Sequence, residues 1–316
     1  MSGLPAGAVP AEVDIVVIGA GPAGFSAALN LARSRHSVLV FDANRRRSAA
    51  ILQSHGFLTR EGISPLELRK LGLAELREYP GTSFHRARVE SLVAVAGGFE
   101  VTVPGIGPVL ARILVLASWL VEILRALPSI RHLYGTSLHS CLVCDGYEKR
   151  DQALALVGET DDLAERALLV SRWSRDVAVS TNGIGRVTEE QEARLADRGI
   201  RIERRAVPDV VGDRSGLTGI ALEDGEVVPR NAGFIRPRYL STIDYAESLS
   251  LRRDADGYVE VDAYGRTSVP WVYAAGDLTP PGPKQLIIAA DAGAMVAGGI
   301  NRDEMLNLPP GPHRIR

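Results

Sequence analysis

The chain has 316 residues, of which 46% are hydrophobic and 23% charged, and this fits a globular protein of about two domains. Its net charge of −2 provides no positive field, so nucleic acid and an anionic membrane surface are excluded as main partners. The most apolar stretch, residues 113–121, is shorter than the roughly 20 residues of a membrane span, and no signal-peptide pattern precedes residue 13, so we expect a cytoplasmic protein.

The first predicted unit is a strand, a glycine turn, a helix and a second strand. Residues 13–18 form an apolar β-type run that leads directly into the Gly-Ala-Gly-Pro-Ala-Gly of residues 19–24. Residues 25–32 have helical spacing, and a second strand over residues 37–41 ends at Asp42. This order of elements is the context in which a G-x-G-x-x-G motif indicates dinucleotide binding rather than an unrelated glycine-rich turn.

Each glycine of that turn has a separate physical role. Gly19 permits the tight turn, Gly21 lets the backbone approach a pyrophosphate, and Gly24 lets helix and strand pack closely. The N-terminus of the helix supplies N–H donors and a positive dipole for the phosphates. Asp42 can accept hydrogen bonds from a ribose diol.

The following region predicts one helix and a small sheet. Ser64-Pro65-Leu66-Glu67 is a capping box with proline at the first helical position, so we expect a helix over residues 65–79. Short β-type segments follow at residues 88–95, 99–103 and 109–117. They predict a β-meander inserted into the first domain.

A second strand–helix–strand unit begins near residue 153. We predict a strand over residues 154–157, a helix over residues 162–171 and a strand over residues 176–180. Thr188-Glu189-Glu190-Gln191 opens another helix, and a strand over residues 200–204 follows.

The end of the chain returns to the first domain. Residues 272–277 predict a strand that runs into a Gly-Asp turn, and residues 285–301 predict a helix so apolar that we expect it to be buried. We therefore predict an α/β protein with two Rossmann-like, three-layer ββα domains, the second inserted into the first. The boundaries that we predict are residues 1–117 with 234–316, and residues 118–233.

Cys141 and Cys144, the two cysteines of the chain, are separated by two residues. Two thiols at this spacing can close a disulfide at a helix start, where the helix dipole lowers a thiolate pKa. Zinc would need two further soft ligands, and the six histidines are scattered apart from His139, so we predict a redox pair and no metal. Asp145 follows Cys144, where a carboxylate either shuttles a proton or caps the helix, and both interpretations stay open.

These features together resemble the low-molecular-weight thioredoxin reductases over nearly the whole chain. The resemblance lies in residues 19–24, the Cys-x-x-Cys-Asp-Gly of residues 141–146, and Ala275-Gly276-Asp277 with a later Lys284-Gln285. It implies a homodimer in which Cys144 faces the flavin and Cys141 exchanges with the substrate. It also implies that FAD contacts Gly19, Gly21, Pro22, Ala23, Gly24, Asp42, Gly276, Asp277 and Gln285.

The second glycine turn departs from the reductase pattern. A reductase has a second G-x-G-x-x-G/A for NADPH, whereas this chain has Gly158-Glu159-Thr160-Asp161-Asp162-Leu163. The three acids repel a pyrophosphate, and the next strand ends at Thr181-Asn182-Gly183 without a basic cluster for the 2′-phosphate. We favour a lost NADPH site over a divergent working one in which Asp161 or Asp162 is only a helix cap.

A lost NADPH site beside an intact Cys-x-x-Cys resembles the FAD-dependent dithiol oxidases that close the disulfides of gliotoxin, holomycin and romidepsin. The resemblance implies oxidation of a small-molecule dithiol, with dioxygen as acceptor and hydrogen peroxide as product. Ser54-His55-Gly56-Phe57-Leu58 also resembles a segment of these enzymes, so His55 is either a residue near the flavin or a packing residue in a loop. The alternatives are a disulfide reductase using NADPH or ferredoxin and a non-enzymatic flavin-binding sensor or scaffold.

Two tryptophans stand where the family usually has glycine. Trp119 follows Ala117-Ser118, and Trp271 precedes the strand that begins at Val272. A large ring at either position puts the local backbone geometry in question.

Overall fold

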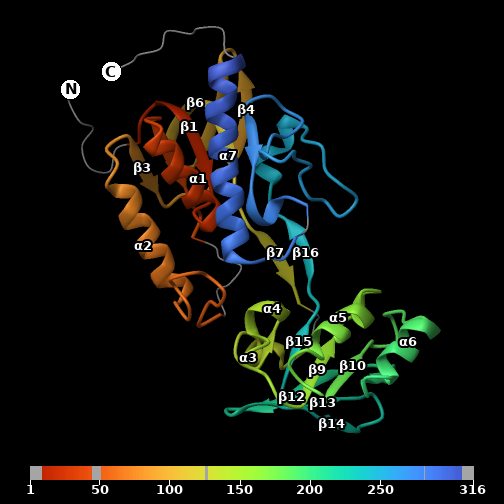
Figure 1. Ribbon diagram of the computed structural model, residues 1–316. Coiled ribbons are helices and arrows are strands. Elements are labelled where there is room, and N and C mark those ends of the chain that lie inside the picture. Colours follow the sequence, from red (N-terminus) through yellow and green to blue (C-terminus); the bar gives the residue numbers. More distant parts are fainter. Residues whose placement is uncertain (1–8, 45–50, 125–126, 281, 308–316) are drawn as a thin grey trace.

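The computed structural model describes residues 9–44, 51–124, 127–280 and 282–307, and the statements below concern these residues (Figure 1). The chain is α/β with two Rossmann-like domains, the second inserted into the first. Each has a sheet with helices on one face and further strands on the other.

The first domain is built on a seven-stranded sheet. Its parallel strands lie in the order β3-β2-β1-β6, with β17 beside β6. Their bounds are β1 Glu12–Ile18, β2 Val38–Phe41, β3 Thr82–His85, β6 Ile106–Leu116 and β17 Val272–Ala274. The helices of this domain are α1 Pro22–Arg33, α2 Pro65–Arg77 and α7 Leu286–Asn307, with short 3-10 turns η1 Asp244–Leu249 and η2 Gly276–Leu278.

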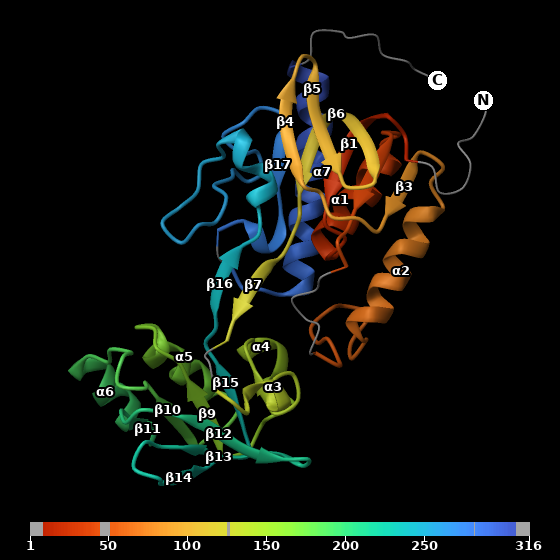
Figure 2. The same cartoon turned by 180° about the vertical axis from the view of Figure 1, so that it is seen from behind.

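The predicted meander is confirmed. Strands β4 (Ser91–Val95) and β5 (Gly98–Val103) pair antiparallel and continue onto the first half of β6. One hydrophobic cluster joins the parallel sheet to α1 and α7, and a second joins its other face to the meander and η1 (Figure 2). The carboxyl ends of β1 and β2 therefore open beside α1, where a dinucleotide site is expected.

The second sheet is fully parallel, in the order β11-β10-β9-β15-β8. Its strands are β8 Leu138–His139, β9 Leu154–Val157, β10 Val177–Ser180, β11 Arg201–Glu203 and β15 Ala232–Ile235. The helices here are α3 Ile130–Leu133, α4 Leu142–Asp145, α5 Leu163–Val170 and α6 Glu189–Ala196. An antiparallel sheet of β12 Asp209–Asp213, β13 Gly216–Ala221 and β14 Val227–Pro229 covers the face opposite α5.

A two-stranded ribbon joins the two sheets. Strand β7 (Leu120–Ile123) pairs antiparallel with β16 (Arg238–Ser241), so the chain enters and leaves the inserted part side by side (Figure 1). We propose that this ribbon divides the two domains. The predicted end of the inserted domain lay between residues 233 and 234. Because β15 pairs with β9 as far as Ile235, we move that boundary to just after residue 235.

The two capped helix starts, at Ser64 and Thr188, agree with the structure, whereas α1 begins at Pro22, three residues before the predicted helix. The predicted burial of the last helix is wrong. Ser64 accepts a hydrogen bond from the Glu67 backbone N–H, and Thr188 and Gln191 form a complete capping box. In α7, Gly293 lets the helix approach α1, since a Cβ there would lie 2.1 Å from the Ala23 carbonyl oxygen. Only that face is covered, so Ile288 stays exposed on the other. Within the described residues, no helix has the length and apolarity to cross a bilayer.

Candidate active site

The first glycine turn is packed so that one of its glycines is left open. Gly19 has a φ of +110°, and a Cβ there would lie 2.3 Å from the Ala117 carbonyl oxygen. A Cβ on Gly24 would lie 1.8 Å from the Gly19 carbonyl oxygen. Gly21 has nothing within 4 Å of its Cβ position and is the N-cap of α1. The fold thus requires Gly19 and Gly24, and it leaves Gly21 free to face a ligand.

A cavity of about 410 Å³ adjoins this turn, a size within the range of small-molecule sites. Helices α1, α2 and α7 contribute to its wall. Six of the predicted cofactor residues line it, namely Gly19, Gly21, Pro22, Asp42, Asp277 and Gln285. Ala23, Gly24, Gly276 and His55 do not line it. Gly276, with a φ of +74°, packs on Ala23 and so brings the two predicted segments together.

Asp42 has a partner that the sequence analysis missed. Its carboxylate accepts a hydrogen bond from the Asn44 backbone N–H at 3.1 Å and forms an ion pair with Arg69 of α2. Both side chains are largely buried and both residues line the cavity. Burial, with a smaller contribution from Arg86, lowers the pKa of Arg69 below its usual value. No local sequence pattern signals this pair, because it depends on how α2 packs.

The loop of residues 51–63 connects the cavity to the inserted domain. Phe57 lines the cavity, and the Cβ position of Gly56 lies 3.7 Å from Gln285 Nε2. His55 instead faces carboxylates, with its Nδ1 2.6 Å from Glu61 Oε1 and 3.6 Å from Glu148 Oε1. Glu148 lies just after the cysteine motif, so the loop touches both the cavity wall and the redox segment.

The atoms of His55, Glu61 and Glu148 that could bind a metal ion lie within 4.8 Å of one another, which is a spacing that a metal ion can bridge. The Glu61 carboxylate is already bound by His55 and by the Gly56 backbone N–H at 2.8 Å. These hydrogen bonds hold the pKa of Glu61 below its usual value. These contacts are sufficient to explain why the three side chains lie together, because they shape the loop.

Cys141 and Cys144 form a disulfide at the start of α4. Cys141 is the N-cap residue of this one-turn helix, Cys144 lies within it, and both are half-buried. The segment is held from behind by Trp173, which leaves no room for a Cβ on Gly146. The two disulfide-bonded residues are therefore partly exposed, on a segment that packs against Trp173.

Asp145 is the last residue of α4 and does not cap its N-terminus. Its Oδ1 lies 3.0 Å from His139 Nδ1, and both side chains are more than nine-tenths buried. The other ring nitrogen of His139, Nε2, lies 3.0 Å from the Thr136 carbonyl oxygen. The sequence analysis considered His139 only as a zinc ligand and missed this pairing.

The segment before Cys141 is anchored by charged groups. Glu122 of β7 accepts hydrogen bonds from Tyr134 Oη at 2.6 Å and from Ser140 Oγ at 3.1 Å. Burial and the neighbouring Glu122 raise the pKa of Tyr134 well above its usual value. Arg166 of α5 donates to the Ser140 carbonyl oxygen at 3.2 Å. The ribbon and α5 therefore fix the approach to the disulfide.

The turn between β9 and α5 is filled by its own side chains. Glu159 accepts a hydrogen bond from Asn182 Nδ2 at 2.7 Å, and Asp161 accepts one from the Arg186 backbone N–H at 3.1 Å. Asp162 lies 3.0 Å from Arg236 Nε. All three carboxylates thus have partners within the protein, and they surround the helix N-terminus with negative charge.

Comparison with known proteins places this geometry in a family. The model of the family described as "Pyridine nucleotide-disulphide oxidoreductase" matches residues 13–88 and 162–293, which is more than half of the chain. The chain belongs to this family. It is therefore an oxidoreductase, and the predicted resemblance to thioredoxin reductase-like enzymes is confirmed by its relatives.

This oxidoreductase is similar to thioredoxin reductases of fungi and bacteria. The relative "Thioredoxin reductase sirT" of Leptosphaeria maculans is 29% identical, over 92% of this chain and 94% of its own. The solved structure of the putative thioredoxin reductase TrxB from Bacillus anthracis is 34% identical, with a TM-score of 0.86 and coverage of 93% and 98%. The structure of HlmI is 31% identical, with a TM-score of 0.87 and coverage of 94% of both chains.

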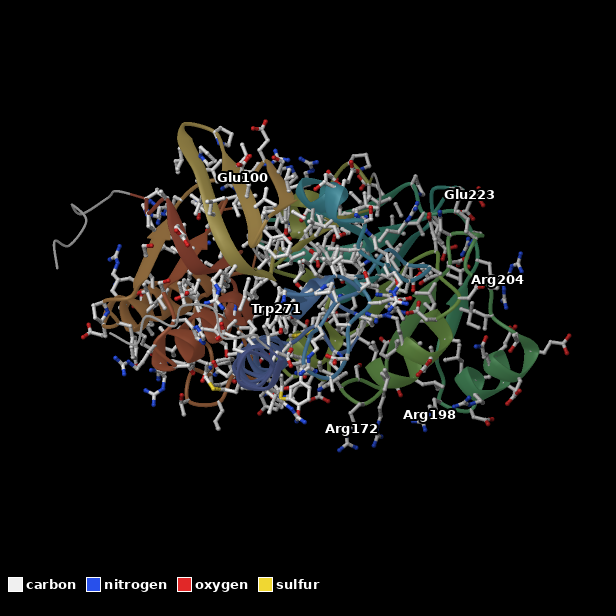
Figure 3. All side chains as sticks on the ribbon, turned by 90° about the horizontal axis from the view of Figure 1, so that it is seen from above. Glu100, Arg172, Arg198, Arg204, Glu223 and Trp271 are labelled. Carbon is white, nitrogen blue, oxygen red and sulfur yellow. A yellow bond between two sulfur atoms is a disulfide. The ribbon has the colours of Figure 1, made fainter. Side chains whose placement is uncertain are left out.

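The two unusual tryptophans of this oxidoreductase occupy different environments. Trp119 lines the cavity, and its carbonyl oxygen accepts a hydrogen bond from Thr242 Oγ1 at 2.6 Å. Trp271 has a φ of +66°, the left-handed region that glycine adopts without strain, which explains why glycine is usual there. Trp271, labelled in Figure 3, is partly buried and packs against both hydrophobic clusters of the first domain.

Proposed function

We propose that this protein is an FAD-dependent dithiol oxidase that closes a disulfide in a small-molecule dithiol. The observation that carries the proposal is the turn between β9 and α5. A family member that accepts electrons from NADPH needs backbone donors and basic side chains at this turn, and here the turn presents three carboxylates. The redox disulfide is nevertheless present, so the electrons enter the protein from a dithiol.

The first cavity fits FAD. Gly21 is open, α1 begins beside it, and Asp42 is placed at the end of β2, which are the features that hold a pyrophosphate and a ribose. The residues that would hold the cofactor are Gly19, Gly21, Pro22, Asp42, Asp277 and Gln285 from the cavity wall, with Ala23, Gly24 and Gly276 behind it. FAD bound there supplies the electron acceptor that returns the cysteine pair to its disulfide form.

The cysteine pair performs the exchange with substrate. A substrate sulfur forms a bond to Cys141 Sγ, the Cys141–Cys144 bond breaks, and Cys144 leaves with the electron pair. The second substrate sulfur then attacks the first, which releases Cys141 and the oxidised substrate. Asp145 is the residue that we assign to proton transfer, because it follows Cys144 directly. The two electrons and two protons removed from the dithiol finally reduce dioxygen to hydrogen peroxide.

A reductase is the second candidate, since the family model is named for pyridine nucleotides and two of the three proteins reported above carry the name thioredoxin reductase. In that case NADPH or ferredoxin supplies electrons, and a disulfide substrate accepts them from the cysteine pair. The third interpretation, a flavin-binding sensor or scaffold, is disfavoured because the cysteine pair is half-exposed and closed as a disulfide.

Anaerobic stopped-flow mixing of the purified flavoprotein separates the oxidase from an NADPH-dependent reductase and from a sensor or scaffold. For an oxidase, dithiothreitol bleaches the flavin within seconds and micromolar NADPH does not, and air then restores the colour with formation of hydrogen peroxide. Rapid bleaching by NADPH would establish the reductase instead. No bleaching by either reagent would leave the sensor or scaffold.

We also propose a homodimer, as in the reductases that the chain resembles. Supporting this, Ile288 and Met295 of α7 lie two helical turns apart and are both exposed in the single chain.

A further inference from the structure

Of the buried ionisable groups near the disulfide, His139 and Asp145 are the pair whose geometry has the most direct chemical consequence. His139 Nδ1 lies 3.0 Å from Asp145 Oδ1, and Nε2 lies 3.0 Å from the Thr136 carbonyl oxygen. A carbonyl oxygen only accepts hydrogen bonds, so Nε2 must carry a proton. That leaves Nδ1 to face the carboxylate either as a lone pair or with a second proton.

We propose that His139 and Asp145 hold one proton between Nδ1 and Oδ1, and that His139 is thereby the positioning residue for the proton that Asp145 transfers. If both atoms lost the proton, a lone pair and a carboxylate oxygen would face each other at 3.0 Å with more than nine-tenths of each side chain buried. Burying that repulsion is unfavourable, so the proton is retained.

The pair is surrounded by a shared carbonyl oxygen, an ammonium group and an aromatic ring. Lys149 Nζ donates to the same Thr136 carbonyl oxygen at 2.7 Å, so that carbonyl receives both an ammonium and the His139 ring N–H. The Phe234 ring of β15 is tilted against the imidazole, at 6.5 Å between centroids. Three charged residues bond to the neighbouring Thr136 and Ser140, namely Lys149, Glu122 and Arg166.

The contact between the His139 and Asp145 side chains departs from ideal hydrogen-bond geometry. His139 Nδ1 is close to Asp145 but lacks hydrogen-bond geometry in the resting disulfide form. An ion pair at that distance tolerates the angle, whereas a fixed hydrogen bond would not.

The positioning role of His139 rests on the proposed thiol–disulfide exchange at the cysteine pair. Protons and electrons balance in that exchange. The first substrate sulfur loses its proton to solvent and bonds to Cys141, while the Cys141–Cys144 bond breaks and Cys144 takes the proton of the pair. The second substrate thiol then returns a proton to the pair as its sulfur attacks the first and releases Cys141 as a thiolate. The substrate has lost two electrons and two protons, and the pair is unchanged.

The protonation claim is tested by NMR of the holoenzyme labelled with ¹⁵N-histidine. We expect the His139 ring at neutral pH to carry protons on both nitrogens, and we expect Asp145→Asn to leave a proton on Nε2 only. His139→Asn identifies the signal. A wild-type His139 without a proton on Nδ1 overturns the proposal, and this outcome is measured on the wild-type protein, with His139→Asn needed only to assign the signal.

The positioning role is tested with dithiothreitol as the reducing probe, counting Cys141 and Cys144 thiols by mass after an acid quench. We expect His139→Phe, which keeps bulk against Phe234, to slow disulfide reduction by about 10²-fold and to change its pH profile. His139→Asn, which keeps a donor toward Asp145, should recover part of the rate. The matched control is His132→Phe on α3, an exposed position.

Equal rates and pH profiles in wild type and His139→Phe overturn the positioning role. Dithiothreitol reduces the disulfide whether the protein is an oxidase or a reductase. A failure of this proposal is therefore distinct from a failure of the proposed function, which shows instead as flavin bleaching by NADPH.

Discussion

Gly21 is the glycine of the first turn at which a side chain meets no protein atom within 4 Å. Gly21→Asp should therefore fold normally and lose its flavin, because the new carboxylate points to where the pyrophosphate approaches. The ratio of flavin to protein absorbance after purification measures this. Gly107→Asp, on β6 at a site equally free of neighbours, is the control and should stay yellow. Full flavin in Gly21→Asp would contradict the assigned cofactor site.

Trp271 combines a strained backbone with a packed ring, and two substitutions separate these effects. Trp271→Ala loses the ring and keeps the left-handed φ of +66°, whereas Trp271→Gly loses the ring and the strain together. We expect both variants to be destabilised by about 2–3 kcal/mol or more, with the glycine variant about 1 kcal/mol the more stable. Urea unfolding of the two variants measures the difference.

Trp173 provides the control for that comparison, because its φ is not positive. There the order should reverse, with Trp173→Gly less stable than Trp173→Ala by about 0.5–1 kcal/mol. If glycine and alanine are equally stable at position 271, the backbone there is not strained.

At the scale of elements, the turn between β9 and α5 determines whether NADPH binds. Glu159→Gln, Asp161→Asn and Asp162→Asn keep the hydrogen-bond acceptors and remove the three charges. Each repulsive contact costs on the order of 1 kcal/mol, so the triple variant should bind NADPH roughly a hundredfold more tightly than wild type. Calorimetric titration measures the two affinities.

The control for the turn is Asp197→Asn, an exposed charge at the C-terminal cap of α6. It should leave NADPH affinity unchanged, because Asp197 does not belong to the turn or to the first turn of α5. An equal gain from this control, or none from the triple variant, would show that the carboxylates of the turn do not exclude the nucleotide.

The elements that the sequence predicted well depend on neighbouring residues. Strand β1 and its glycine turn follow from residues that are adjacent in the chain, as do the helix cap at Ser64 and the capping box at Thr188. The ribbon of β7 and β16 was not predicted, because its partners, such as Leu120 and Ser241, are distant in sequence. Neither strand has an alternating pattern long enough to identify it alone.

The residues of the candidate site likewise fall into those that local motifs predicted and those that only tertiary packing brings together. The cavity residues of the glycine turn and the cysteine pair were found from local motifs. The Asp42–Arg69 and Asp145–His139 pairs were missed because each joins two elements through tertiary packing. A charged residue in a helix is usually solvated, so Arg69 gave no signal before its burial was known.

For the whole molecule, the exposed apolar face of α7 is the feature that a single chain leaves unexplained. Ile288 is 39% exposed and Met295 38% exposed, although the sequence had predicted a buried helix. A second copy packed on this face would bury both, and the protein should therefore sediment at twice its 33.9 kDa chain mass. Ile288→Glu with Met295→Glu should give a monomer, because two unpaired carboxylates in an apolar interface are strongly unfavourable.

Val211→Glu is the matched control for this last variant. Val211 is an apolar residue of β12 in the inserted domain, 37% exposed, and a charge there should leave the dimer intact. Analytical ultracentrifugation at micromolar concentration distinguishes the species, and circular dichroism checks that each variant is folded. A monomeric wild type, or a dimer that survives both α7 substitutions, would mean that α7 is not the interface. In that case its apolar face must be covered by another partner.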